Sequence, residues 1–194
     1  MMKPPTPTGW HSLLPGLLSL LAACVFMLVA AALYWPTPEA AFRTDDSPVA
    51  WLSSAQLWAM AILCLRLWQE RALPRLLCLW LALAMMAMAF DEQFMLHEHW
   101  KYQCIDWLDA CRHGWVTELP MLLVAVLGTL SGVQLHRALR NPCLSAQLGL
   151  AILCGLFALY LRFTQQPAEL LPYKAALLVI AEALFLGCLL GLRR

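Results

Sequence analysis

Charged residues are scarce in this chain of 194 residues. Asp, Glu, Lys and Arg make up 13% of it, whereas a soluble domain has about 25%. Hydrophobic residues make up 62% of the sequence, and the mean hydropathy is +0.68. A soluble globule of this size has too little interior to hide so much apolar surface. The sequence therefore disfavours a soluble enzyme, a nucleic-acid binder and a disordered chain, and it predicts an integral membrane protein.

An excess of charge of either sign is also lacking. The 13 basic and 12 acidic side chains leave a formal net charge of +1. Binding to a polyanion such as a nucleic acid would require a strongly basic surface. We therefore expect no nucleic-acid partner. The expected partners are the lipid bilayer and a second membrane protein.

Long polar segments and internal repeats are lacking as well. A spanning helix needs about 20 mostly apolar residues, because the hydrocarbon core is about 30 Å thick. The six runs that qualify are 13–35, 50–68, 73–97, 118–135, 144–161 and 172–192. We predict an all-α fold, with 1–194 forming a single polytopic bundle of six transmembrane helices joined by short loops.

The first apolar run also has features of a cleaved signal. Lys3 precedes it, and Leu21-Ala22-Ala23-Cys24 matches a lipobox. A lipoprotein turns polar soon after its Cys, whereas this chain continues with the apolar residues 25–29. The run is also longer than the usual secretory signal. An uncleaved first span is favoured, and cleavage after residues 30–32, which would leave five spans, is the alternative.

Basic residues are divided unevenly between the two sets of connections. One set holds Lys3, Arg66, Arg71, Arg75, Arg137, Arg140, Arg193 and Arg194. The other set holds Arg43, Lys101, Arg112, Arg162 and Lys174. Because cytoplasmic loops are enriched in Lys and Arg, the first set is predicted to be cytoplasmic. Both termini would then lie in the cytoplasm, with the protein in a bacterial inner membrane.

The third run ends in an unusually polar stretch. The apolar part before it, 76–90, is fifteen residues long, or about 22 Å of helix. Asp91 and Glu92 are therefore expected just below the outer interface. Ionisable side chains at that depth normally face a protein interior or a wet cavity.

Carboxylates and imidazoles follow one another in this stretch, and together they suit zinc, iron or manganese. The candidate metal ligands are Asp91, Glu92, His97, Glu98 and His99. On a regular helix Asp91 and Glu98 share a face, while His97 points elsewhere. The alternative is a helix end that frays into an acidic, solvated loop.

Two acids on other spans are candidate general bases. Glu118 opens the fourth span, where the helix dipole also favours an acid. Glu182 lies near the middle of the sixth span, where it needs a partner, a proton or a cation. Tyr160 and Arg162 are its candidate partners. Beside a metal, either acid could activate a bound water.

The outer loop after the third span contains Cys104 and Cys111. A disulfide between them would staple a short periplasmic loop, and this interpretation is favoured. The alternative is a metal site made of both thiolates and nearby histidines, but the spacing matches no standard zinc pattern.

Two Gly-x-x-x-Gly pairs, Gly128 with Gly132 and Gly187 with Gly191, lie in the inner halves of the fourth and sixth spans. Such spacings allow neighbouring helices to approach closely. They predict tight packing on the inner side.

The run Asp91-Glu92-x-x-x-x-His97-Glu98 at the outer end of a membrane helix resembles a motif in small multi-pass bacterial membrane proteins of uncharacterised function. The resemblance covers the third span and the six-span layout. It implies a membrane helix bundle and no particular activity.

Two functions stay open. The first is a metal-dependent intramembrane hydrolase that acts on a lipid-like substrate, with Ser53 and Ser54 as further candidates for the nucleophile. Nothing in the sequence places these serines near a base. The second is a non-enzymatic protein, such as a membrane subunit, an assembly factor or a proton- or cation-handling protein.

Overall fold

The computed structural model describes residues 10–43, 47–163 and 171–192. Its elements are η1 (Trp10–Ser12), α1 (Leu14–Leu33), α2 (Ala40–Arg43), α3 (Pro48–Gln69), α4 (Arg75–Phe94), α5 (Leu96–Trp107), η2 (Asp109–Arg112), α6 (Gly114–Thr117), α7 (Leu119–Ala138), α8 (Pro142–Phe163) and α9 (Leu171–Leu192). The described part of the chain contains helices and no strand, so the predicted all-α fold is confirmed.

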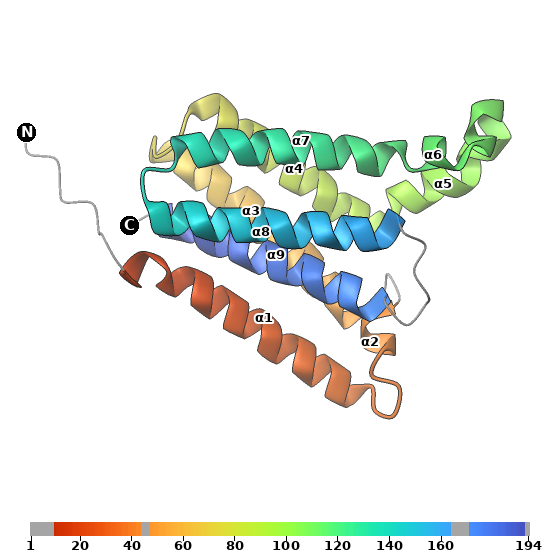
Figure 1. Cartoon of the computed structure of the whole chain (residues 1–194), viewed down its shortest axis with the longest axis horizontal. Helices are drawn as coiled ribbons and strands as arrows, with labels where there is room; N and C mark the ends of the chain where they lie inside the picture. The colour runs from red at the N-terminus through yellow and green to blue at the C-terminus, as the bar shows by residue number, and fades with distance from the viewer. Residues whose placement is uncertain (1–9, 44–46, 164–170, 193–194) are drawn as a thin grey trace, which may run out of the picture.

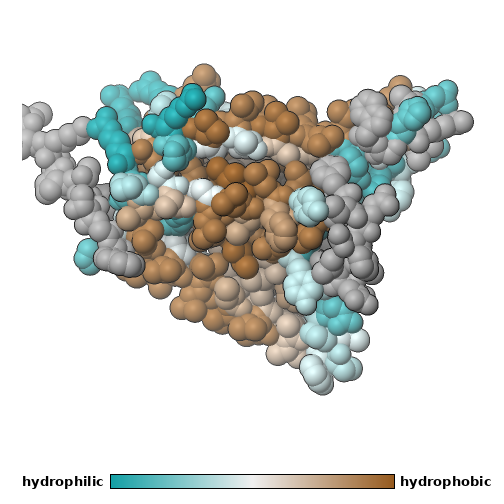
Figure 2. Space-filling view, viewed as in Figure 1, coloured by the Kyte–Doolittle hydropathy of each residue, from teal (hydrophilic) through white to brown (hydrophobic). Residues whose placement is uncertain are grey.

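Six of these helices are long and apolar enough to cross a membrane. They are α1, α3, α4, α7, α8 and α9, each of 20 or 22 residues, or about 30–33 Å. They run along the long axis of the molecule (Figure 1). Hydrophobic side chains cover the middle of the visible face, and hydrophilic ones gather towards both ends (Figure 2). The predicted six-span membrane protein is confirmed.

Two helices, α3 and α9, form the centre of the bundle. Half of the spanning window of each is buried, against 17–28% for the other four spans. The last helix, α9, packs against α8, α1 and α3, and α3 also packs against α4. The largest core cluster joins α3 and α4 to α8 and α9, with Leu57, Leu81, Leu148 and Leu189 among its fully buried side chains. Polar groups on α3 and α9 are therefore held away from lipid.

Small residues allow α1, α8 and α9 to meet closely. The backbone of Gly16 and the amide of Gln147 occupy the space that a side chain at Gly187 would need. A Cβ at Gly191 would lie 2.6 Å from Leu144 Cδ2. The close approach predicted for this glycine pair is confirmed.

The other glycine pair behaves differently at its two positions. A Cβ at Gly132 on α7 would lie 2.7 Å from Ile152 Cδ1 on α8, whereas a Cβ at Gly128 would have no heavy atom within 4 Å. Gly132 therefore permits a close contact. The close approach expected at Gly128 is not found, because no other helix among the described residues comes within 4 Å of a Cβ at that position.

The third span is shorter than the sequence predicts. Its helix, α4, ends at Phe94 rather than continuing to His97, because Met95 adopts a left-handed conformation with φ 51°. A new helix, α5, begins at Leu96. Together with η2 and α6 it lies at the end of the bundle opposite the start of α1 and the end of α9 (Figure 1).

Candidate functional site

The break at Met95 brings Asp91 and His97 together. Asp91 Oδ1 accepts a hydrogen bond of 2.8 Å from the main-chain N–H of His97, and Oδ2 lies 2.8 Å from His97 Nδ1. The carboxylate thus satisfies one of the free N–H groups at the start of α5. The expectation that His97 points away from Asp91 is wrong, because it assumed a regular helix through Met95.

The remaining predicted metal ligands are not gathered around this pair. His99 Nδ1 lies 3.0 Å from the main-chain oxygen of Met95. Within the ranges that the structure describes, no three His, Cys, Asp or Glu side chains are arranged to hold a metal ion. The metal site stays a prediction, and so does zinc, iron or manganese as its cofactor.

Glu118, one of the two predicted general bases, lies at the junction of α6 and α7. Its Oε1 accepts a hydrogen bond of 3.0 Å from Lys101 Nζ on α5. This ion pair ties α5 to the start of α7. Its role as a general base stays a prediction.

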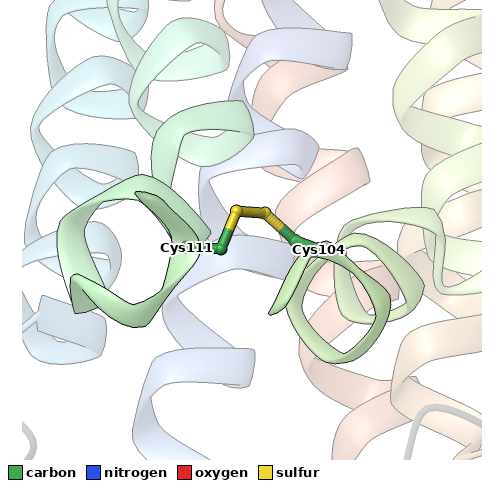
Figure 3. The surroundings of a disulfide bond; sticks show 2 residues. All are labelled: Cys104 and Cys111. Carbon is green, nitrogen blue, oxygen red and sulfur yellow. A yellow bond between two sulfur atoms is a disulfide. The ribbon is translucent and has the colours of Figure 1, made fainter. Parts of the chain in front are cut away.

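Cys104 on α5 and Cys111 on η2 form a disulfide bond (Figure 3), with their Cα atoms 5.8 Å apart. Both cysteines are buried against Val116 and Trp100 in a small cluster of their own. The bond closes the turn between α5 and η2, and it commits both thiols so that neither is available to a metal.

Glu182 occupies a buried polar site between the two central helices. Its side chain is 5% exposed, and it lies halfway along α9. The hydroxyl of Ser53 on α3, itself 2% exposed, donates a hydrogen bond of 2.8 Å to Glu182 Oε1. The sequence offered Tyr160 and Arg162 as partners. The hydrogen bond to Oε1 comes from α3; Tyr160 as a partner stays a prediction, and the Arg162 side chain lies outside the described residues.

Gln56 completes the set of groups around this carboxyl. One terminal atom of its amide lies 3.2 Å from Glu182 Oε2 and 3.2 Å from the main-chain oxygen of Val179. With the nitrogen in that position, the amide donates a hydrogen bond to both oxygens. Each oxygen of the Glu182 carboxyl then has one neutral donor.

Helical spacing explains why these four residues meet. Ser53 and Gln56 are three residues apart and share a face of α3, as Val179 and Glu182 do on α9. Gln56 was not among the candidates predicted from the sequence. Its signal in the sequence is the occurrence of two polar residues, Ser53 and Gln56, three positions apart within an apolar span.

The neighbouring serine faces a different helix. Ser54 Oγ donates a hydrogen bond of 3.4 Å to the main-chain oxygen of Ala89 on α4. One turn further along α4 lies Glu92, whose charge interacts with that of Glu182. The site therefore lies where α3, α4 and α9 meet, and the role of Glu92 as a metal ligand stays a prediction.

The arrangement restricts the chemistry of Glu182. The two ion pairs found among the described residues, Asp91 with His97 and Glu118 with Lys101, do not include Glu182. Glu182 is hydrogen-bonded to neutral groups. A bare charge in this interior would be costly. The carboxyl is compatible with its surroundings when it carries a proton or holds a cation.

These features define a multi-pass membrane protein with six spans and a buried polar site at its centre. No protein family, no curated protein and no solved structure matches the chain. The resemblance to bacterial proteins with the Asp-Glu-x4-His-Glu motif therefore stays a prediction.

Proposed function

We propose that this is a proton-handling membrane protein in which Glu182 takes up and releases a proton inside the bilayer. The observation that carries the proposal is the burial of Glu182 among neutral hydrogen-bonding groups at mid-span. Ionisable groups at that depth are rare, and they mark proton relays and ion pathways.

The surrounding side chains can serve both charge states of the carboxyl. When Glu182 is ionised, the Ser53 hydroxyl and the Gln56 amide nitrogen donate to its two oxygens. When Glu182 is protonated, rotating the Gln56 amide places an oxygen 3.2 Å from Oε2, where it accepts the carboxyl proton. A change of protonation therefore requires only a rotation of one amide, with no rearrangement of helices.

The proposed orientation places both termini in the cytoplasm of a bacterium. The start of α1 and the end of α9 lie at one end of the bundle, and α5, whose Cys104 forms the disulfide with Cys111, lies at the other (Figure 1). Disulfides persist in the periplasm and are rare in the cytoplasm. The disulfide therefore supports the same orientation as the distribution of Lys and Arg.

Infrared difference spectroscopy of the full chain in lipid nanodiscs tests the proposed proton site. The carbonyl band of a protonated carboxyl should appear and disappear with pH, and Glu182→Gln should remove that band. Glu118→Gln is the control, because Glu118 is paired with Lys101 outside the core. A spectrum unchanged by Glu182→Gln would contradict the proposal.

A serine hydrolase is the second candidate, favoured by one observation. The Ser53 hydroxyl lies 2.8 Å from a carboxyl oxygen, which is within the reach that joins a nucleophile to its base. A fluorophosphonate probe should label Ser53 in an enzyme of this kind, and Ser53→Ala should abolish the labelling while Ser54→Ala preserves it. Absence of labelling at Ser53 would contradict the hydrolase, and the contact between Ser53 and Glu182 would then be explained by the proton site.

A further inference from the structure

The groups around Glu182 include an unusual convergence of oxygen atoms. Beside the two carboxyl oxygens lie Ser53 Oγ, the main-chain oxygen of Val179 and the side-chain amide of Gln56. With its oxygen directed inwards, the Gln56 amide would face only acceptors, the Val179 oxygen and Glu182 Oε2, each at 3.2 Å. Oxygens so close together repel one another unless a proton or a cation lies among them.

The spacing of these oxygens fits a small hard cation. Such ions are bound by carboxylate, carbonyl, amide and water oxygens, and ligands at about 2.3 Å that subtend a right angle lie about 3.2 Å apart. The carbonyl of Val179 can join them because a carbonyl oxygen has a second lone pair beyond its helical hydrogen bond. The 3.2 Å separations therefore match the ligand spacing around an ion of this size.

The charge of the site selects a monovalent ion. One carboxylate contributes a single negative charge, and the hydroxyl, the amide and the carbonyl are neutral. A monovalent cation leaves the buried site neutral, as a proton does, whereas a divalent ion leaves an unbalanced charge. Zinc and iron favour imidazole and thiolate ligands, and neither type is among these contacts.

We propose that Ser53, Gln56, Val179 and Glu182 bind a sodium ion that competes with the proton for the Glu182 carboxylate. The inference rests on the proposed function, since it names the ion that the same carboxyl exchanges for its proton. In the exchange one positive charge replaces another: sodium enters as the proton leaves, and the amide of Gln56 keeps its oxygen directed inwards, as it is when Glu182 is protonated. The net charge of the site is the same in both states.

The charged group that acts on this site is Glu92 of α4. Its negative charge attracts a proton and a sodium ion alike, so it strengthens cation binding without selecting between them. Other titratable side chains lie on the elements that pack against Glu182 and on α9 itself. Those that the structure describes are Cys24, Cys64, Arg66, Arg75, Cys78, Asp91, Cys143, Cys154, Tyr160, Tyr173, Lys174 and Cys188. The hydrogen bonds described at the Glu182 carboxyl come from Ser53 and Gln56.

Titration of the Glu182 carbonyl band in different salts tests the competition. The full chain in nanodiscs is titrated in sodium chloride and in N-methylglucamine chloride at equal ionic strength. Competition predicts that sodium moves the midpoint to lower pH, by about one pH unit for each tenfold rise in sodium once the site is saturated. Potassium, which is larger, should act more weakly.

Two variants and a control locate the site. Ser53→Ala and Gln56→Leu each remove one oxygen, and each should raise the sodium concentration needed for a given shift by about tenfold or more. Ser54→Ala should behave as wild type, because Ser54 bonds to Ala89 instead. Direct binding of radioactive sodium to the wild-type chain, at one ion per chain, gives a readout that needs no variant.

The outcomes separate the two proposals. A midpoint that is identical in sodium and N-methylglucamine, with a band that still disappears in Glu182→Gln, overturns the sodium site and leaves the proton site intact. A band that is unaffected by Glu182→Gln overturns the proton site itself. A sodium shift that persists unchanged in both Ser53→Ala and Gln56→Leu also overturns the assignment of the ligands.

Discussion

The hydroxyl of Ser53 on α3 lies 2.8 Å from Oε1 of Glu182 on α9, inside the bundle. This bond joins the two most buried spans through groups 129 positions apart in the sequence. It turns a mid-span acid, which is costly in isolation, into part of a polar contact between helices.

Loss of this bond should weaken the bundle. Ser53→Ala leaves a buried carboxyl oxygen with one donor fewer, so we expect a loss of about 1–3 kcal/mol of stability. Ser54→Ala removes a longer bond, of 3.4 Å, and should cost less. Unfolding of both variants in mixed micelles would check the order, and equal losses would contradict the role given to Ser53.

The contact between α1 and α9 should depend on Gly187. A side chain there would collide with the backbone of Gly16, which cannot move aside as a flexible side chain can. Gly187→Ala should therefore cost about 1–3 kcal/mol or more. Gly128→Ala is the matched control, because its Cβ would meet nothing within 4 Å. Thermal unfolding followed by circular dichroism would show the difference, and two similar melting temperatures would count against this packing.

The Cys104–Cys111 disulfide gives a prediction about the compartment in which it lies. Cys104 and Cys111 should resist an alkylating reagent in intact cells until a reductant is added, and the two should then react together. Mass spectrometry of the isolated protein would count the labelled thiols. Immediate labelling of Cys104 without reductant would contradict a periplasmic disulfide. Reporter fusions at both ends of the chain would test the orientation independently.

Asp91 is expected to stabilise the start of α5. Asp91→Ala removes the acceptor for both the main-chain N–H and the ring of His97, and loss of a helix cap costs about 0.5–2 kcal/mol. Hydrogen exchange should become faster in α5 and stay unchanged in α9.

Elemental analysis of the wild-type protein, of Asp91→Ala and of Glu92→Gln would test the predicted metal site. A metal ion present at one per chain in the wild type and lost in the variants would support that site.

Much of the fold follows from hydropathy and length. Six apolar runs of about 20 residues become six spans, because the bilayer sets the length of a helix. The break at Met95 is different. Neither Gly nor Pro marks it, and it occurs together with the hydrogen bond from the His97 main chain to Asp91. An expectation based on a regular helix places the side chains of Asp91 and His97 on different faces.

The candidate site shows the same limit. The burial of an acid at mid-span identifies Glu182 as a residue that needs a partner. The choice of partner depends on how α3 and α9 lie against each other, and one sequence contains no direct record of that register. The spacing of Ser53 and Gln56 indicates a polar face, but only the packed structure shows that this face meets Glu182.

The central claim is that Glu182 exchanges a proton within the membrane. Infrared titration of the full chain, compared with Glu182→Gln, measures this exchange at the carboxyl itself. The account predicts a protonated carboxyl band that titrates with pH in the wild type and in Glu118→Gln, and that is missing from Glu182→Gln. A band that persists in Glu182→Gln, or a Glu182 carboxyl that does not change between acid and alkaline pH, would contradict it.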